Sequence, residues 1–240
     1  MAEKILDIIM PVYNEAASIQ QPLSEIVSRI LNVIPGSRLL AIDDGSRDDS
    51  GRILDAWEKD HPSQMKVFHK VNSGHGDSLL YGLQRAEAEW IFLLDSDNQI
   101  AVGQFLKLWE RRRQANLLMG RRARRQDPQL RIWLTGLIRA FLRFYFGANI
   151  YDANVPFKLF KRSLWEKVKI FIPPDTLAPS LFLAVIAKKL EYSLLETEVE
   201  HSPRKAGTSS LKKFKLFRFC LKALRQLLAL RMTLPSTSRK

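Results

Sequence analysis

Two aspartates one residue apart follow an apolar run near the middle of the chain. The run Trp90-Ile91-Phe92-Leu93-Leu94 is typical of a buried strand, and Asp95 and Asp97 come directly after it. Because side chains alternate along a strand, this spacing directs both carboxylates to the same side. Hard divalent cations prefer oxygen ligands and often contact phosphates as well. The pair therefore indicates a site for a metal-bound nucleotide diphosphate, and the alternative interpretation is an ordinary polar turn.

Polar turns also follow the other strands that the sequence predicts. We expect strands at residues 5–12, 38–42 and 65–69, with helices around residues 19–34, 53–57 and 79–86. Strands that alternate with helices pair in parallel, and their ligands bind beyond the carboxyl ends of the strands. The predicted fold is therefore α/β, with a mostly parallel central sheet and helices on both faces. Six residues should converge at one edge of this sheet: Tyr13, Asn14, Asp43, Asp44, Asp95 and Asp97.

The second half of the chain is richer in positive charge. We expect strands at residues 117–119, 156–160 and 192–199, a helix at 175–189, and a basic amphipathic helix at 132–146. A second basic helix, at 211–231, has an apolar seam formed by Phe214, Phe217, Leu221, Leu224 and Leu228. It either lies in a membrane interface or packs its seam on the domain. We divide the chain into a domain at 1–210, this helix at 211–234 and a tail at 235–240.

Composition limits the classes of partner and the compartment. The chain has 240 residues, and its 38 Lys and Arg against 25 Asp and Glu give a net charge of +13, which implies an anionic partner. Its single cysteine, Cys220, and the lack of a secretory pattern at the first residues predict the cytoplasm. No apolar segment is long enough to span a bilayer, so we expect a cytoplasmic protein or one peripheral on the cytoplasmic face of the membrane.

Several separated motifs give the chain a family resemblance. They are Pro11-Val12-Tyr13-Asn14-Glu15, Asp43-Asp44-Gly45-Ser46, the glycine loop from Asn72 to Gly82, Asp95-Ser96-Asp97-Asn98-Gln99, Gly120-Arg121-Arg122, Asp152 to Lys158, and His201 to Ser210. In this order they resemble the family 2 glycosyltransferases of GT-A fold. The similarity is greatest to the polyprenyl-phosphate glycosyltransferases that include dolichol-phosphate mannose synthase, and it extends from Asp7 to Leu211.

The resemblance implies roles at the donor end of the site. It implies that Pro11, Tyr13 and Glu15 surround the nucleoside of a nucleotide-diphosphate sugar. It implies that Asp43 and Asp44 contact the base or the ribose; alternatively, the turn that contains Asp44 only caps the next helix. Three residues match the metal-binding pattern Asp-x-Asp-x-Gln and would bind Mg²⁺ or Mn²⁺: Asp95, Asp97 and Gln99.

At the acceptor end, the resemblance implies that Arg122 and Arg131 bind a polyprenyl phosphate. It implies that Arg204 binds the donor phosphates as a loop closes. Asp175 lies where the family places its acceptor-side loop and is a candidate base. A phosphate with a second pKa near about 6 is largely ionised at neutral pH and needs no base, whereas a hydroxyl does.

Three functional hypotheses follow. The first is an inverting, metal-dependent transfer of a sugar to polyprenyl phosphate, in which Asp97, Arg122, Arg131 and Asp175 are the candidate catalytic residues. The second keeps this donor and transfers the sugar to a hydroxyl on a glycan, lipid or protein. The third, a nucleic-acid-binding module, is disfavoured because the positive residues lie on helices with wide apolar seams and no nucleic-acid-binding motif is present.

Overall fold

The N-terminal half of the chain forms four parallel strands. The computed structural model describes residues 3–123, 129–202 and 213–234; the side chains of residues 123, 129–132 and 213–219 lie outside this description. The strands β1 (Leu6–Val12), β2 (Ser37–Asp43), β3 (Met65–His69) and β4 (Trp90–Leu93) pair in the spatial order β3-β2-β1-β4. Every residue of β1 and β4 is buried, as expected of a parallel sheet covered on both faces.

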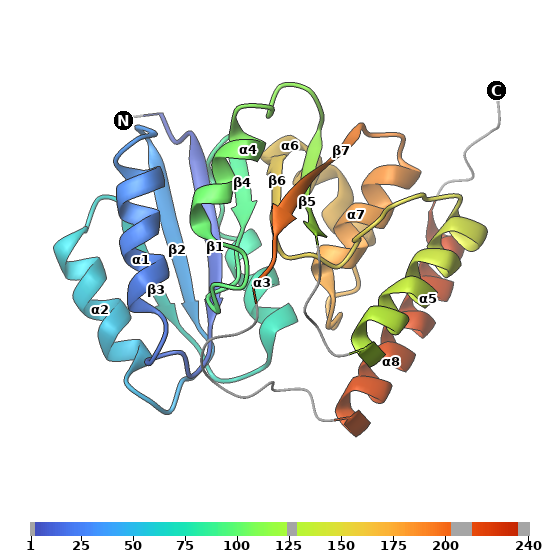
Figure 1. Cartoon of the computed structure of the whole chain (residues 1–240), viewed down its shortest axis with the longest axis horizontal. Helices are drawn as coiled ribbons and strands as arrows, with labels where there is room; N and C mark the ends of the chain where they lie inside the picture. Colours follow the sequence, from blue (N-terminus) through green and yellow to red (C-terminus); the bar gives the residue numbers. More distant parts are fainter. Residues whose placement is uncertain (1–2, 124–128, 203–212, 235–240) are drawn as a thin grey trace.

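Three further strands extend the same sheet (Figure 1). They are β5 (Leu117–Ala123), β6 (Lys158–Lys161) and β7 (Leu194–Glu200), and the complete order is β3-β2-β1-β4-β6-β5-β7. β5 and β7 pair in parallel, whereas β6 lies between β4 and β5 and is antiparallel to both. The predicted α/β fold with a mostly parallel sheet is therefore confirmed, and β6 is the strand that reverses direction.

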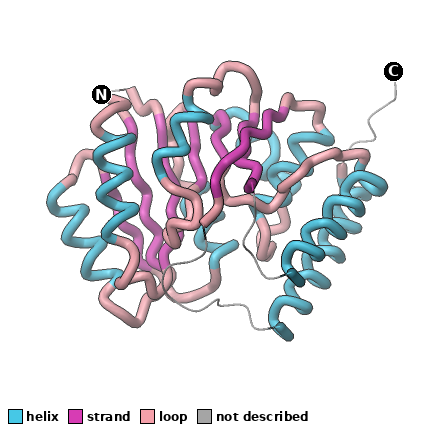
Figure 2. The backbone as a smooth tube through the Cα atoms, in the orientation of Figure 1, coloured by secondary structure: helices cyan, strands magenta, loops and turns pink. Residues whose placement is uncertain are grey.

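Helices cover both faces of the sheet (Figures 1 and 2). Contacts join α3 to β1 and β2, and α3, α5 and α6 each contact α7, while α1 contacts η2 on the other face. The helical segments are α1 (Gln20–Ile26), the π-helix η1 (Val27–Leu31), α2 (Ser50–Asp60), α3 (His75–Leu83), η2 (Val102–Gln104), α4 (Phe105–Trp109), α5 (Gln129–Phe146), α6 (Arg162–Val168), η3 (Lys169–Phe171), α7 (Pro179–Lys189) and α8 (Lys213–Thr233).

Some boundaries differ from the prediction. The helix expected at Asp175 begins at Pro179, because residues before it form a turn in which the amide of Thr176 donates to the carbonyl oxygen of Pro173 at 3.1 Å. The short helices α4 and α6 are absent from the prediction. Each spans only one or two turns, which is too short for a helical period to stand out in the sequence.

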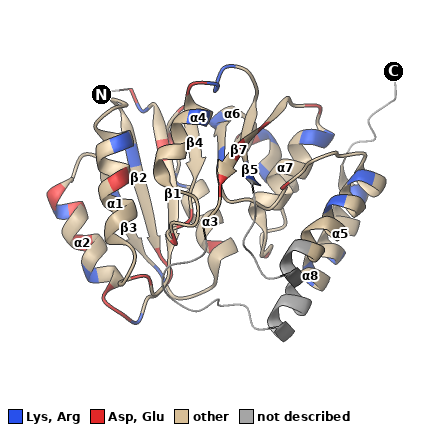
Figure 3. Ribbon diagram, viewed as in Figure 1, with Lys and Arg blue, Asp and Glu red and all other residues tan. Residues whose placement is uncertain are grey.

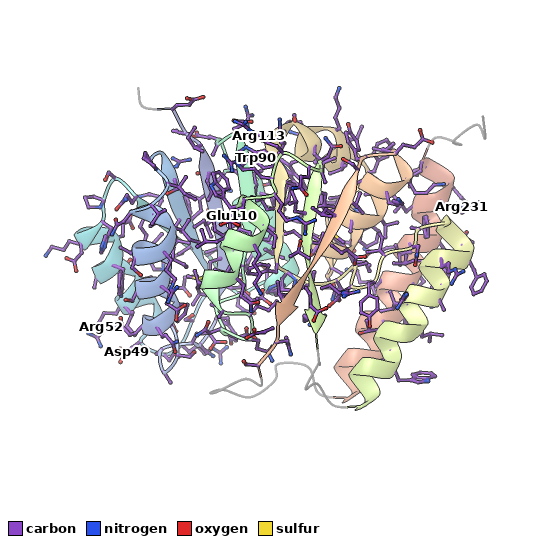
Figure 4. The ribbon with its side chains drawn as sticks, turned by 45° about the horizontal axis from the view of Figure 1, so that its top comes forward. Asp49, Arg52, Trp90, Glu110, Arg113 and Arg231 are labelled. Carbon is purple, nitrogen blue, oxygen red and sulfur yellow. The ribbon has the colours of Figure 1, made fainter. Side chains whose placement is uncertain are left out.

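The helices α5 and α8 lie side by side at one end of the molecule (Figures 1 and 4), where the guanidinium of Arg231 donates to the carbonyl oxygen of Tyr145 at 2.6 Å. The face of α8 that joins the core includes Leu227 and Leu230, and Leu234, directly after the helix, joins the core as well. Leu221, Leu224 and Leu228 of the predicted seam are exposed, so in its described part this seam does not pack on the domain, because the helix turns the neighbouring stripe inward. Phe214 and Phe217 lie outside the described side chains. The boundary at residue 210 stays a prediction.

Close packing of α3 on β1 leads to a first prediction. A Cβ added at Gly82 would lie 2.5 Å from Cγ2 of Ile9, so Gly82→Ala should lower the free energy of unfolding by about 1–3 kcal/mol through overpacking. A Cβ at Gly136, within α5, would meet nothing within 4 Å, so Gly136→Ala should instead raise it by about 0.5–1 kcal/mol. Urea unfolding of both variants measures the two changes, and equal effects would contradict this packing.

Candidate active site

The carboxyl ends of β1, β2 and β4 bring the predicted polar residues to one edge of the sheet. Val12 and Asp43 are paired at the ends of β1 and β2, and the amide of Asp44 donates to the carbonyl oxygen of Val12 at 2.9 Å. β4 ends at Leu93, and Leu94 still donates to the carbonyl oxygen of Ile9 at 3.1 Å. Acidic residues follow at this edge (Figure 3), as the alternation of strands and helices predicts.

The segment Asp95–Gln99 lines a small cavity beyond β4. Asp95, Asp97 and Gln99 share this cavity with Leu94, Ile100, Arg122, Pro156, Phe157 and His201. The alternation of a strand does not place the two carboxylates, because the strand has already ended. A turn places them instead: Asn98 has a left-handed φ of 53°, and the amide of Gln99 donates to Oδ1 of Asp97 at 3.2 Å.

The donor atoms around this cavity fit a hard cation that is bound together with a nucleotide. Among the described residues, no group of three or more His, Cys, Asp and Glu side chains could hold a metal ion by itself. Two carboxylates and the amide oxygen of Gln99 suit Mg²⁺ or Mn²⁺, which often take their remaining oxygen ligands from substrate phosphates and water. The residues present therefore fit a metal whose coordination a diphosphate completes.

Two histidines border residues 95–99, which we call the metal motif because they match the predicted metal-binding pattern. His75, the first residue of α3, contacts Oδ1 of Asp95 through Nε2 at 2.8 Å. His201 follows β7, is 6% exposed and lines the cavity itself. The amide of Ser202 donates to the carbonyl oxygen of Gln99 at 2.8 Å, which ties the segment after β7 to the metal motif. Arg204, predicted to bind donor phosphates from this segment, lies outside the described residues.

At the end of the site that is predicted to bind the nucleoside, Asp43 is held by His69, a residue that was not among the predicted site residues. The carboxylate of Asp43 accepts a hydrogen bond from the amide of Ser46 at 2.9 Å and contacts Nδ1 of His69 at 2.8 Å. Nε2 of the same ring contacts Asp55 on α2 at 2.9 Å. The hydrogen bonds to Asp43 and then to Asp55 raise the pKa of His69. Asp43 is thus 5% exposed and held in one orientation at the end of β2.

The other predicted nucleoside contacts differ in accessibility. Tyr13 follows the last residue of β1 and is 38% exposed. Pro11 is buried within β1. Glu15 is 5% exposed, and one of its carboxylate oxygens accepts a hydrogen bond from the hydroxyl of Ser18 at 2.7 Å. Of these three side chains, Tyr13 offers the most surface to a nucleoside.

Asp44 holds the glycine loop in place. Its carboxylate accepts hydrogen bonds from the amides of Ser73 at 2.9 Å and Gly74 at 2.8 Å, and from Nδ2 of Asn72 at 3.2 Å. Nζ of Lys70 adds an ion pair at 2.7 Å. Burial alone would raise the pKa of Asp44, but the hydrogen bonds from Lys70 and the two amides lower it on balance. With these four donors on its two oxygens, Asp44 shapes the loop, and its contact with base or ribose stays a prediction.

Arg122 reaches the cavity from β5. Its guanidinium makes a bidentate pair with Asp152, with Nε–Oδ2 and Nη2–Oδ1 distances of 2.6 and 2.9 Å. Asp152 is 2% exposed, so this pair fixes the planar fork of the arginine at the cavity wall. The backbone of Arg131 lies in α5, but its side chain is outside the description.

Lys158 is fully buried behind the same wall. Its ammonium donates to the hydroxyl of Ser180 at 2.6 Å and to the carbonyl oxygens of Ala153, at 3.0 Å, and Val155. It therefore joins the segment that precedes β6 to the first turn of α7. Burial lowers the pKa of Lys158 to about 7. The signal in the sequence that could have found this residue is a lysine within the apolar run Phe157-Lys158-Leu159-Phe160.

Asp175, the candidate base, is bound to α8 instead of facing the cavity. Its carboxylate lies 2.7 Å from Nζ of Lys222 and accepts a hydrogen bond from Nε2 of Gln226 at 2.9 Å. The hydrogen bond from Lys222 lowers the pKa of Asp175, which makes its carboxylate a weaker proton acceptor. Asp175 is absent from the lining of the cavity that holds Asp95 and Asp97. Its role as a base stays an untested prediction.

The sequence of this chain matches a known protein family and individual relatives. The family model described as glycosyl transferase family 2 matches residues 7–175. The chain is 27% identical to the undecaprenyl-phosphate 4-deoxy-4-formamido-L-arabinose transferase of Pseudomonas aeruginosa over 214 residues, which cover 88% of this chain and 62% of the relative. It is also 27% identical to the protein of the same name from Shewanella sediminis, over 85% of this chain and 61% of that one. The chain thus spans less than two thirds of the length of these relatives.

Solved structures share the fold at lower sequence identity. A mannosyltransferase from Pyrobaculum calidifontis in complex with GDP-Man and Mn²⁺ has a TM-score of 0.64 and 17% identity, covering 99% of this chain and 66% of that one. Glucosyl-3-phosphoglycerate synthase from Mycobacterium tuberculosis in complex with Mn²⁺, uridine-diphosphate-glucose and glycerol 3-phosphate has a TM-score of 0.67 and 15% identity, covering 98% and 82%. These similarities establish the GT-A fold.

The buried amine of Lys158 leads to a second prediction, on stability against pH. Its pKa is about 7 in the folded chain and about 10.4 in an unfolded one, so between these values the unfolded state binds more protons. The group therefore lowers stability most below its folded pKa, and this penalty declines as the pH rises toward the unfolded pKa. Relative to Lys158→Met, the wild-type free energy of unfolding should increase between about pH 7 and about pH 9.

Urea unfolding at several pH values measures this difference. Lys161→Met is the matched control, because Lys161 lies on the same strand with 45% of its side chain exposed. It should leave the pH dependence of the wild type unchanged. A difference between wild type and Lys158→Met that does not vary with pH would contradict the lowered pKa.

Proposed function

The chain belongs to glycosyl transferase family 2, and on that premise we propose that it transfers a sugar from a nucleotide-diphosphate sugar to a polyprenyl phosphate. The observation that carries the proposal is the shared cavity beyond β4, where Asp95, Asp97 and Gln99 lie together with Arg122. One part of this wall suits a metal-bound diphosphate, and the other suits a phosphate acceptor. The names of the relatives, which act on undecaprenyl phosphate, support this acceptor class.

On the donor side, each residue has a binding role. Asp43, oriented by His69, accepts hydrogen bonds from the base or ribose, and Tyr13 packs against the nucleoside. Asp95, Asp97 and Gln99 would hold Mg²⁺ or Mn²⁺, which supplies charge neutralisation for the diphosphate that departs. The mannosyltransferase of the same fold, solved with GDP-Man and Mn²⁺, supports a metal of this kind.

On the acceptor side, Arg122 and Arg131 bind the phosphate of the lipid, whereas Arg204 binds the phosphates of the donor. An oxygen of the acceptor phosphate forms a bond to the anomeric carbon while the bond from that carbon to the nucleotide diphosphate breaks, which inverts the configuration. The attacking phosphate is already ionised at neutral pH, so the step requires no proton transfer to the protein. The residues act mainly by positioning the reactants and stabilising charge.

A transfer assay with a donor panel tests this function. UDP-, GDP- and dTDP-sugars are incubated with the protein, Mn²⁺ and undecaprenyl phosphate, and lipid-linked sugar is measured. We expect product from at least one donor, and we expect Asp97→Ala or a chelator to abolish it because diphosphate binding loses its cation. Product with a hydroxyl acceptor but none with the lipid phosphate would refute the acceptor assignment. Unchanged transfer by Asp97→Ala would refute the metal site.

We further propose that the protein binds the cytoplasmic face of the membrane through α5 and α8. No helix in the described residues is long and apolar enough to cross a bilayer. The two neighbouring helices instead expose large apolar side chains beside basic residues, an arrangement that suits an interface with anionic lipid. The exposed apolar residues are Trp133, Leu137 and Phe144 on α5 and Leu221, Leu224 and Leu228 on α8.

Vesicle sedimentation tests this location. The protein should bind vesicles that contain phosphatidylcholine and phosphatidylglycerol, and it should bind vesicles of phosphatidylcholine alone less strongly. The double variant Trp133→Ser and Phe144→Ser should lose most of this binding, because these side chains are 65% and 87% exposed. The matched control is Val33→Ser with Ile170→Ser, at 58% and 73% exposure elsewhere on the molecule, which should bind as wild type does. Equal losses in both double variants would contradict the proposed surface.

A further inference from the structure

Asp175 is held to α8 at three points. Nζ of Lys222 lies 2.7 Å from its carboxylate and donates to its backbone carbonyl oxygen at 2.6 Å, and Nε2 of Gln226 donates to Oδ1 at 2.9 Å. Lys222 and Gln226 are four residues apart, so they lie on the same face of α8. The helix itself is anchored in the core by Leu227 and Leu230, each 3% exposed. Two side chains of an anchored helix thus hold one residue of the connection between η3 and α7.

The same connection, residues 172–178, lies against the first turn of α3 on its other side. Thr176 is 2% exposed, and a Cβ added at Gly76 would lie 2.7 Å from the carbonyl oxygen of Thr176 and 2.9 Å from that of Leu177. The backbone of the connection therefore lies directly on the first turn of α3. The residue before Gly76 is His75, which contacts Asp95 at 2.8 Å. A continuous series of contacts runs from α8 through residues 172–178 and α3 to the metal motif.

We propose that Asp175 is a positioning residue and that Lys222 and Gln226, by binding it, fix residues 172–178 against α3 so that the metal motif at residues 95–99 is preformed. The inference rests on the proposed function, because it assigns a role within that reaction. It replaces a proton-accepting role for Asp175 with a mechanical one. An ionised phosphate acceptor has no need of a base, and a carboxylate already bound to an ammonium and an amide is poorly suited to become one.

We call the contacts of Lys222 and Gln226 with Asp175 the tether. Substitutions at these residues distinguish a positioning role for Asp175 from a role as a base. Gln226→Ala should raise the KM for the nucleotide-sugar donor about fivefold, with the KM for the lipid phosphate little changed, because it removes one hydrogen bond to Asp175. Asp175→Ala should raise it at least as much, because it also removes the ion pair with Lys222. The double variant should be no worse than Asp175→Ala, since that change has already removed the bond from Gln226. Asp175→Asn should be affected less than Asp175→Ala, because its amide oxygen can still accept from Gln226 and its backbone carbonyl oxygen still accepts from Lys222. Arg225→Ala, the neighbouring exposed position, is the control and should change neither constant.

These assays use the whole chain and detergent-solubilised undecaprenyl phosphate, so that membrane binding does not limit the rate. A fall in kcat of about a hundredfold or more in Asp175→Asn would identify a base and overturn the proposal. Additive effects of the two alanine variants, or wild-type kinetics in Gln226→Ala, would also overturn it.

Hydrogen exchange supplies a readout that is independent of transfer. In Gln226→Ala, amides of residues 172–178 and of the first turn of α3 should exchange faster than in the wild type, while those of β1 stay protected. Unchanged exchange in these segments overturns the tether even if transfer is active. Faster exchange in a protein that transfers no sugar to any lipid phosphate would support the tether while refuting the proposed function.

Discussion

The candidate site depends on one constraint: the negative charges of the aspartates at the carboxyl ends of the strands must be balanced by positively charged or titratable side chains. Asp43 and Asp44 adjoin each other at the end of β2, and Asp95 follows the end of β4. Each has a cationic or titratable partner from a separate segment: His69 for Asp43, Lys70 for Asp44, and the first residue of α3 for Asp95. These partners hold the acidic side chains together without a ligand, and they also fix the loops that carry them.

The hydrogen-bond and ion-pair partners of the acidic residues indicate which of them shape loops and which can bind a cation. Asp44 accepts from two loop amides as well as from Lys70, so its main effect is on the shape of the glycine loop. Asp95 and Asp97 line a cavity. The carboxylate of Asp175 is bound by Lys222 and Gln226 of α8. Carboxylates with equal chemistry thus divide into those that shape loops and those that can bind a cation.

The C-terminal half provides the opposite charge. Arg122 is fixed by a buried carboxylate, and Lys158 joins the segment before β6 to α7. The antiparallel strand β6 makes this possible, because it places the segment after Asp152 beside the end of β4. The lining of the cavity consequently combines Asp95 and Asp97 with Arg122, which suits the proposed pair of phosphate-bearing substrates.

The sequence by itself determined the alternation of strands and helices, the strand that precedes Asp95, and the polar turns after β1 and β2. These depend on local hydrophobic periodicity and on residues next to one another in the chain. The tertiary structure alone decided that β6 runs antiparallel, that His69 orients Asp43, that Lys158 lies buried, and that α8 turns Leu227 inward. Each of these depends on pairing between segments far apart in sequence, and one residue of rotation or one reversed strand changes which side chains meet. Local sequence patterns do not predict the strand direction or the side-chain pairs, because these are decided by the free energy of burial and charge pairing in the assembled fold.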